Sequence, residues 1–214
     1  MHYYDKEPVF KEMRVRRIRD MVRGGMPLNF VSAPSVFSGE YIDAGTRLLA
    51  ENMVIMNDWD VLDMGCGYGG VLGIVAAKLA PRGGRVVMVD TNKLAVKLAA
   101  INIRINNVDN AEVRWGGDLY GAVQGERFNT VISNPPITAG LEVNRRLIIG
   151  AREHLKPGGL LQIVIPKKLR SRFEEILYGN YDIVERLAKS GNYIAYVAKV
   201  MDYPPDLMPK SHHA

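Results

Sequence analysis

The residues Asn134-Pro135-Pro136-Ile137 form the clearest chemical pattern in the sequence. They follow the apolar run 128–133, which predicts a buried strand, and a proline disfavours helical geometry in the residue before it. Asn134 should therefore lie extended at the carboxyl end of that strand, with a stiff loop behind it. Its side-chain oxygen and the Pro135 carbonyl oxygen could accept both hydrogens of a planar amino group. Such acceptors would free the nitrogen lone pair and stabilise the positive charge that develops when the nitrogen is alkylated.

A glycine-rich segment supplies the second pattern. Gly65, Gly67 and Gly70 give G-x-G-x-x-G between an apolar run and a helical one, and Asp90 follows Gly70 by twenty residues. This spacing is also that of dinucleotide-binding loops, in which the acidic residue accepts hydrogen bonds from a ribose. However, Asp63 precedes the first glycine by two residues, and a carboxylate there would repel a pyrophosphate but suit a cationic ligand. The Asn-Pro-Pro loop, in addition, has no task in hydride transfer.

The elements that must position these residues alternate along the chain. Expected strands are 60–64, 85–89, 112–115, 128–133 and 160–165, and expected helices are 44–53, 71–79, 92–106, 141–154 and 168–178. Asp43 should cap the first helix, and Pro157-Gly158-Gly159 should form a turn. Segments 181–189 and 193–200 predict an antiparallel hairpin. The result is an α/β fold, with a doubly wound, mostly parallel seven-stranded sheet and helices on both faces.

The N-terminal segment is basic and predicts a separate β extension. Residues 13–22 and 28–32 flank the Gly24-Gly25 break, which favours two strands joined by a turn. Six basic residues lie in this segment: Lys11, Arg14, Arg16, Arg17, Arg19 and Arg23. They could be a solvated edge that discourages aggregation or a contact for RNA, and the sequence favours neither. We expect an arm and basic extension over 1–34, a main domain over 35–203 and a flexible tail over 204–214.

Composition narrows the class of protein. The 214 residues are 47% hydrophobic and 24% charged with a net charge of +5, as in an ordinary globular chain with a mild preference for anionic partners. One cysteine, Cys66, excludes an internal disulfide and, with four scattered histidines, gives no metal-ligand spacing. No apolar run could span a membrane, and the first residues hold no signal-peptide core. We therefore expect a cytoplasmic location and no metal.

Four segments, taken in order, resemble one family. Val36-Phe37-Ser38, Asp43-Ala44-Gly45-Thr46, the segment 63–69 and Asn134-Pro135-Pro136-Ile137 match the small-methyltransferase group of class I S-adenosylmethionine-dependent methyltransferases. Within that group the chain is similar to the guanine-N2 methyltransferases of small-subunit ribosomal RNA. The resemblance covers roughly residues 35–200. It implies a Rossmann-like fold, S-adenosylmethionine as cofactor, and methyl transfer to an exocyclic amino nitrogen in RNA, most naturally guanine N2 or cytosine N4 of ribosomal RNA.

The resemblance also assigns roles to single residues. Asp63 would hold the cofactor ammonium, Asp90 its ribose hydroxyls and Asp118 its adenine amino group. The implied cofactor-binding residues are Asp63, Gly65, Cys66, Gly67, Gly69, Asp90, Thr91, Asp118, Leu119 and Asn134. The implied catalytic residues are Asn134, Pro135 and Pro136, and the expected substrate contacts are Phe37, Ile137, Arg14, Arg16, Arg17, Arg19, Lys167 and Lys168. Ile137 stands where related enzymes often carry a stacking aromatic, so Phe37 or Tyr41 could stack on the base instead.

Three other interpretations stay open. Methylation of a glutamine side chain in a protein uses the same Asn-Pro-Pro chemistry, but those enzymes usually carry Tyr where Ile137 stands and have a helical N-terminal domain. Methylation of a DNA amine would call for a target-recognition domain, for which this chain has no room. A non-catalytic RNA-binding subunit is disfavoured by the intact Asn-Pro-Pro sequence.

Overall fold

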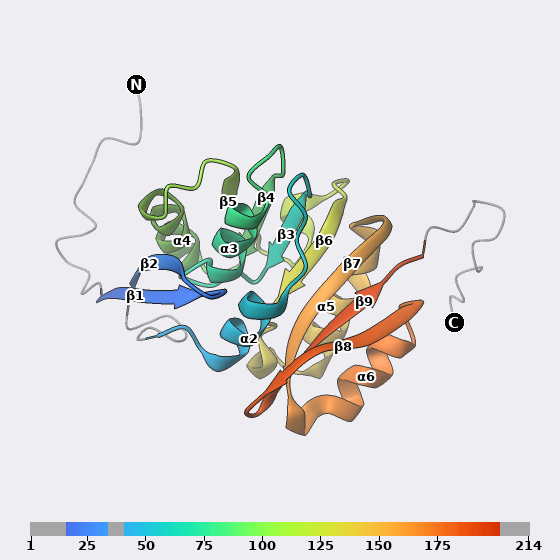
Figure 1. The fold of residues 1–214 in the computed structure, drawn as a ribbon. Coiled ribbons are helices and arrows are strands. Elements are labelled where there is room, and N and C mark those ends of the chain that lie inside the picture. Colours follow the sequence, from blue (N-terminus) through green and yellow to red (C-terminus); the bar gives the residue numbers. More distant parts are fainter. Residues whose placement is uncertain (1–15, 34–40, 202–214) are drawn as a thin grey trace.

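A computed structural model describes residues 16–33 and 41–201 of the chain. The described residues form a seven-stranded sheet covered by helices, and a separate two-stranded hairpin (Figure 1). The strands are β1 Arg16–Val22, β2 Met26–Ser32, β3 Val61–Met64, β4 Val86–Asp90, β5 Ala111–Trp115, β6 Phe128–Ser133, β7 Leu155–Pro166, β8 Ile183–Ser190 and β9 Tyr193–Lys199. The helices are α2 Ala44–Asn52, α3 Val71–Leu79, α4 Lys93–Ile105, α5 Leu141–Glu153 and α6 Arg170–Tyr178, with short 3-10 turns η1 Gly121–Val123, η2 Ile137–Ala139 and η3 Lys167–Leu169.

The sheet has the predicted architecture. Its order is β5-β4-β3-β6-β7-β9-β8, in which the first five strands run parallel and β9 is antiparallel to both neighbours. Successive strand residues point to opposite faces, so the apolar runs supply two cores. Leu49, Val75 and Leu98 bring α2, α3 and α4 onto one face. Leu147 and Phe173 bring α5 and α6 onto the other. The predicted Rossmann-like fold is confirmed.

One predicted turn is wrong. Pro157-Gly158-Gly159 lies inside β7, which begins at Leu155 rather than at residue 160. Pairing with β6 moves from Phe128 opposite Leu155 to Thr130 opposite Leu160, so the extra residues bulge out of the ladder without ending the strand. Gly158 adopts a φ of 75°, which allows the chain to loop out and return to the same neighbour.

The strand order reverses at the centre of the sheet. β3 pairs with β4 on one side and with β6 on the other. The Ser133 hydroxyl, at the end of β6, donates a 2.7 Å hydrogen bond to the carbonyl of Met64 at the end of β3. The two carboxyl ends are thereby tied together. Ligands of open α/β sheets bind at such a reversal, so the two loops that follow these strands are the place for a site.

The predicted N-terminal β extension is confirmed as the hairpin β1–β2, and α4 binds its outer strand. Asn102 accepts from Val31 N at 2.7 Å and donates to Val31 O at 3.0 Å. One helical turn later, Asn106 makes the same pair with the backbone of Asn29, at 3.0 and 2.7 Å. Two amides on one face of a helix therefore replace the ladder that a third strand would offer. The expected boundaries at 34 and 204 fall outside the described residues and stay predictions.

The hairpin also rests on α2 (Figure 1). Arg23, in the hairpin turn, donates to the carbonyls of Ala50, Glu51 and Met53 at 3.0–3.2 Å. These carbonyls lie at the end of α2, where they have no partner within the helix. One member of the basic run thus closes a helix end, which changes its interpretation as part of a charged edge. No helix in the described part of the chain is both long and apolar enough to cross a membrane.

Candidate active site

Asn134 lies at the end of β6 with its amide turned in one direction. Its Nδ2 donates to Asp43 Oδ1 at 3.1 Å and to Thr46 Oγ1 at 2.9 Å. A carboxylate only accepts hydrogen bonds, so the nitrogen of the amide must face Asp43. The amide oxygen is thereby directed away from α2, and no described residue donates to it. It is the acceptor that the sequence analysis assigned to the substrate amine.

The start of α2 supplies the partners of this amide. Asp43 caps the helix as predicted, since its Oδ1 accepts from Gly45 N and Thr46 N, each at 3.0 Å. Gly45 leaves no space for a side chain, because a Cβ there would lie 3.1 Å from the ring of Tyr193. Sequence reasoning gave Asp43 a capping role only and gave Thr46 none. The signal available for both was their place in the second of the four family segments.

The two proline carbonyls differ in availability. Pro136 O accepts from Ala139 N at 2.9 Å and from Asn144 Nδ2 at 3.2 Å. No donor among the described residues reaches Pro135 O, which is the carbonyl that the sequence analysis singled out. Asn144 is buried on α5 and also donates to Gly140 O at 2.6 Å, so it fixes the loop from behind. The sequence gave no sign of this support.

The glycine-rich loop follows β3 and bends back over β4. Gly65 N and Cys66 N both donate to Val89 O, at 2.9 and 3.0 Å. Gly65 and Gly67 have φ values of 76° and 63°, which other residues adopt at a cost. The Cys66 side chain is half-buried in this loop, and burial raises the pKa of its thiol.

Asp63 is buried beneath the loop. Its Oδ2 accepts from Gly73 N at 2.8 Å, while its Oδ1 is buried and has no partner among the described residues. Burial raises the pKa of this carboxyl to about 7; the Gly73 hydrogen bond lowers it, and the nearby charge of Asp90 raises it further. An unpaired buried carboxylate oxygen is unfavourable. The site therefore fits a ligand that brings a cationic donor, such as an ammonium group.

Asp90, at the end of β4, shapes the same loop. Its Oδ2 accepts from Gly67 N and its Oδ1 from Asn92 N, both at 2.8 Å. Each carboxylate oxygen can accept a further hydrogen bond, so two hydroxyls could still be bound. The neighbouring Thr91 is exposed, and its carbonyl accepts from Trp115 Nε1 at 2.9 Å. Sequence reasoning missed the half-exposed Trp115 ring at this rim.

The segment expected at the adenine is open to solvent. Asp118 is exposed and pairs with Arg146 of α5, Oδ1 to Nη2, at 3.1 Å. Leu119 is half-buried against the α5 and α6 core. Both residues line a shallow hollow between η1 and α5, together with Gly121, Arg145, Ile149 and Gly150. Asp118 and Leu119 thus lie at the same edge of the sheet as the other loops.

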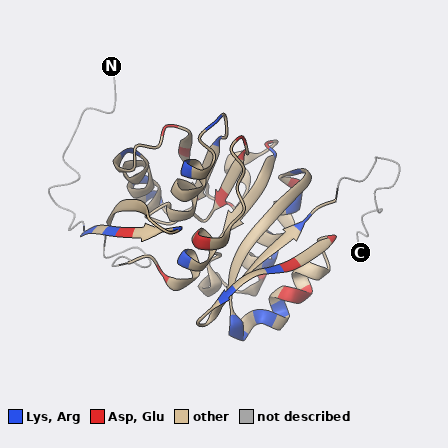
Figure 2. Ribbon diagram, viewed as in Figure 1, with Lys and Arg blue, Asp and Glu red and all other residues tan. Residues whose placement is uncertain are grey.

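The expected substrate contacts are scattered. Ile137 is half-buried and packs on the core beneath α5 and α6, while Tyr41 is 63% exposed beside the start of α2. Phe37 and Arg14 lie outside the described residues. Arg16, Arg17 and Arg19 are exposed on β1, and Lys168 is exposed on η3. The Lys167 ammonium donates to Gly191 O in the β8–β9 turn. Figure 2 shows Lys and Arg on β1 and around the start of α6, on either side of α2.

A sheet of this order, with its crevice between β3 and β6, defines the class I S-adenosylmethionine-dependent methyltransferases. Within that class, residues 27–197 match the family model of the methyltransferase small domain, and the chain belongs to that family.

Relatives and solved structures agree with this assignment. Ribosomal RNA small subunit methyltransferase C of Aeromonas hydrophila is 34% identical over 181 residues, covering 83% of this chain and 51% of that protein. The uncharacterised protein YbxB of Bacillus subtilis is 32% identical over 93% of this chain and 98% of its own length. A T. thermophilus structure, described as a 16S rRNA N2 G1207 methyltransferase with AdoMet and guanosine, has a TM-score of 0.73 at 25% identity, covering 87% of this chain and 50% of that chain. The chain thus spans about half the length of the relatives that are named as ribosomal RNA enzymes.

Proposed function

We propose that the chain transfers a methyl group from S-adenosylmethionine to an exocyclic amino nitrogen of a base in ribosomal RNA. Guanine N2 is the first target and cytosine N4 the second. The observation that carries this proposal is the orientation of Asn134, whose amide hydrogens are taken by Asp43 and Thr46. The amide oxygen and Pro135 O are then two acceptors without described donors, at the point where the strand order reverses.

These acceptors suit an amine that is a poor nucleophile. A base amino group has its lone pair delocalised into the ring. When its two hydrogens are bound by Asn134 Oδ1 and Pro135 O, the nitrogen is held closer to tetrahedral geometry, and the charge that develops during transfer is stabilised. No general base is needed, because the nitrogen becomes acidic only as the methyl group arrives.

The residues around the crevice fit S-adenosylmethionine. The unpaired Oδ1 of Asp63 would accept from its ammonium, and the remaining lone pairs of Asp90 would accept from its ribose. Gly65, Cys66, Gly67 and Gly69 would lie along its methionine part, Thr91 and Leu119 beside its adenine, and Asp118 at the adenine amino group. When bound, the cofactor supplies an electrophilic methyl group on a sulfonium.

The preference for guanine rests on the T. thermophilus relative, whose structure was solved with guanosine. Because Ile137 packs into the core, the exposed ring of Tyr41 or the ring of Phe37 is the better candidate to stack on the base. Arg16, Arg17, Arg19, Lys167 and Lys168 would contact RNA phosphates. A base in a duplex would have to leave the stack to reach Asn134.

The test compares nucleosides from ribosomal RNA of cells with and without the active gene by mass spectrometry. One methylated guanosine or cytidine should disappear without the gene. It should return with the wild-type chain but not with Asn134→Ala, which should bind S-adenosylmethionine with nearly unchanged affinity. Identical nucleosides in the two strains, or methyl label that enters protein instead of RNA, would exclude the proposed substrate. Normal turnover by Asn134→Ala would exclude the mechanism.

A further inference from the structure

We propose that Asp43 and Thr46 are positioning residues that fix the Asn134 amide with its oxygen toward the substrate amine. We also propose that the Asp43 charge strengthens that oxygen as an acceptor. Both residues begin α2, far in sequence from the loop that they serve, and both bind the same nitrogen, at 3.1 and 2.9 Å. The inference rests on the function proposed above and names how the chain prepares that site.

An asparagine amide has two orientations that differ by a half-turn, and its terminal torsion is soft. In the useful orientation the oxygen faces the amine. In the other, the NH2 group would face the amine, donor against donor, and the oxygen would face the Asp43 carboxylate, acceptor against acceptor. Asp43 cannot donate in its ionised form, so it disfavours the second orientation. Thr46 holds the second amide hydrogen and so limits rotation of the amide plane.

The start of α2 is held rigidly enough for this task. A single atom, Asp43 Oδ1, accepts from Gly45 N, Thr46 N and Asn134 Nδ2. The backbone donors and the helix dipole stabilise the negative charge at this end of the helix. Behind it, a Cβ on Gly45 would lie 3.1 Å from the Tyr193 ring and 3.2 Å from Asp43 Oδ1. The helix start is therefore closely packed against β9 and cannot shift without clashes.

The Asp43 charge also acts through the amide. A carboxylate that accepts from Nδ2 polarises the amide and makes its oxygen more negative, as in other hydrogen-bond chains in a medium of low dielectric constant. Positive charge develops on the amine during transfer, so a more negative oxygen lowers the barrier. The field of Asp43 reaches the glycine-rich loop as well: burial, and after it the charge of Asp43, raises the pKa of Tyr68 to about 12.

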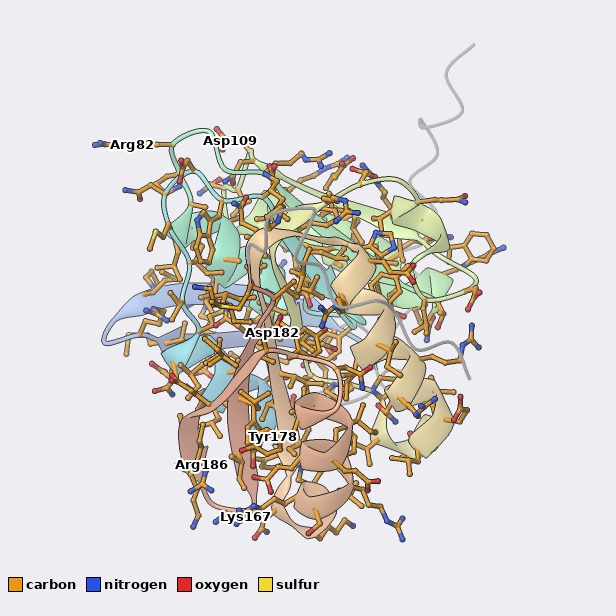
Figure 3. The ribbon with its side chains drawn as sticks, turned by 90° about the vertical axis from the view of Figure 1, so that its right-hand side faces the viewer. Arg82, Asp109, Lys167, Tyr178, Asp182 and Arg186 are labelled. Atoms are coloured by element: carbon orange, nitrogen blue, oxygen red, sulfur yellow. The ribbon has the colours of Figure 1, made fainter. Side chains whose placement is uncertain are left out.

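Two pairs of variants separate positioning from folding. Thr46→Val keeps the shape and removes the acceptor, whereas Thr46→Ser keeps the hydroxyl. Asp43→Asn keeps a good cap and an acceptor oxygen but removes the charge. Its control is Asp109→Asn, an equal charge change at an exposed residue, which Figure 3 places at the end of the molecule opposite to Lys167 and the carboxyl edge of the sheet.

The first measurement is the single-turnover rate of methyl transfer at saturating S-adenosylmethionine and RNA. Thr46→Val and Asp43→Asn should each slow it by about tenfold to a hundredfold, somewhat less than the loss of a direct electrostatic contact. Thr46→Ser should recover most of the rate, and Asp109→Asn should leave it unchanged. Melting temperature and cofactor affinity should stay near wild type in all four. Wild-type rates in both Thr46→Val and Asp43→Asn would overturn the proposal, as would rates that fall only in step with stability.

The second measurement does not depend on activity. The side-chain NH2 signals of Asn134 are assigned in a nitrogen–proton NMR spectrum by their loss in Asn134→Ala. In the wild type they should be dispersed and slow to exchange with water, and Thr46→Val should shift them and speed their exchange, whereas Thr46→Ser should not. Rapidly exchanging signals in the wild type would refute the positioning role whatever the RNA assay gives. Protected signals in a protein that methylates no RNA would refute the proposed function and leave the positioning intact.

Discussion

Asn102 on α4 offers the sharpest test of how the fold supports the cofactor loop. Its Oδ1 accepts from Val31 N at 2.7 Å, and its Nδ2 donates to Val31 O and to Tyr68 O, both at 3.0 Å. One buried amide thus joins the hairpin to the glycine-rich loop. Asn102→Ala would remove all three hydrogen bonds and leave a buried backbone donor without a partner.

The expected size follows from these contacts. Each hydrogen bond contributes about 0.5–1.5 kcal/mol net, so the free energy of unfolding should fall by about 1.5–4.5 kcal/mol, toward the upper end because Val31 N stays buried. The bond to Tyr68 O belongs to the loop. Its loss, at about 1 kcal/mol, should raise the Kd for S-adenosylmethionine roughly fivefold.

Asn110 provides a matched control. Its Nδ2 donates to Ala77 O, Ala80 O and Gly84 O at 2.8–3.2 Å, away from the loop. Denaturant unfolding and calorimetry, well below the melting temperatures, should find both Asn→Ala variants less stable and only Asn102→Ala weaker in cofactor binding. Equal cofactor affinity in the two variants would refute the idea that Asn102 supports the loop, and an unchanged stability of Asn102→Ala would refute the energetic reasoning.

Three more predictions concern charged residues. The raised pKa of Asp63 means that folded-state stability is greatest below its ordinary value of 3.8 and falls as the pH rises to about 7; thermal melts of Asp63→Asn without cofactor should therefore show an advantage over wild type that grows across this range, while calorimetry finds weaker cofactor binding. Arg17→Ala/Arg19→Ala should reduce the salt slope of RNA binding by about 1.4, or 0.7 for each phosphate contact on a single strand, and Arg82→Ala should not change it. Arg23→Ala should lower the free energy of unfolding by about 1–3 kcal/mol, as measured in denaturant, with no change in that slope.

Local chemistry explains why so much of the fold could be predicted. Two prolines after a β-branched run end β6 at Ser133, and the position of Asn134 follows without any distant contact. Asp43 before a helical run is an equally local signal, and it does cap α2. The predicted turn at Pro157-Gly158-Gly159 failed because glycine permits a bulge as readily as a turn, and only the pairing with β6 decides between them.

The parts that could not be predicted depend on distant residues. Asn134 and its two partners are separated by 91 and 88 positions, and no periodicity in the sequence connects them. Arg23 looked like one more charge in a basic run, since nothing local shows that the end of α2 lies within its reach. In both cases the sequence gave the chemical type of the residue, and only the tertiary structure gave its partner.

These two long-range contacts meet in one helix. Arg23 binds the last carbonyls of α2, and Asp43 at its first turn binds Asn134. A helix of nine residues is about 13 Å long and stiff, so its two ends move together. The basic hairpin therefore has a structural task that does not depend on RNA: it holds α2 at the distance from β6 at which the cap reaches the amide. If the hairpin also binds phosphate, a bound RNA and the oriented Asn134 share this single rigid connection, which is a physical reason for placing a basic β extension ahead of the sheet.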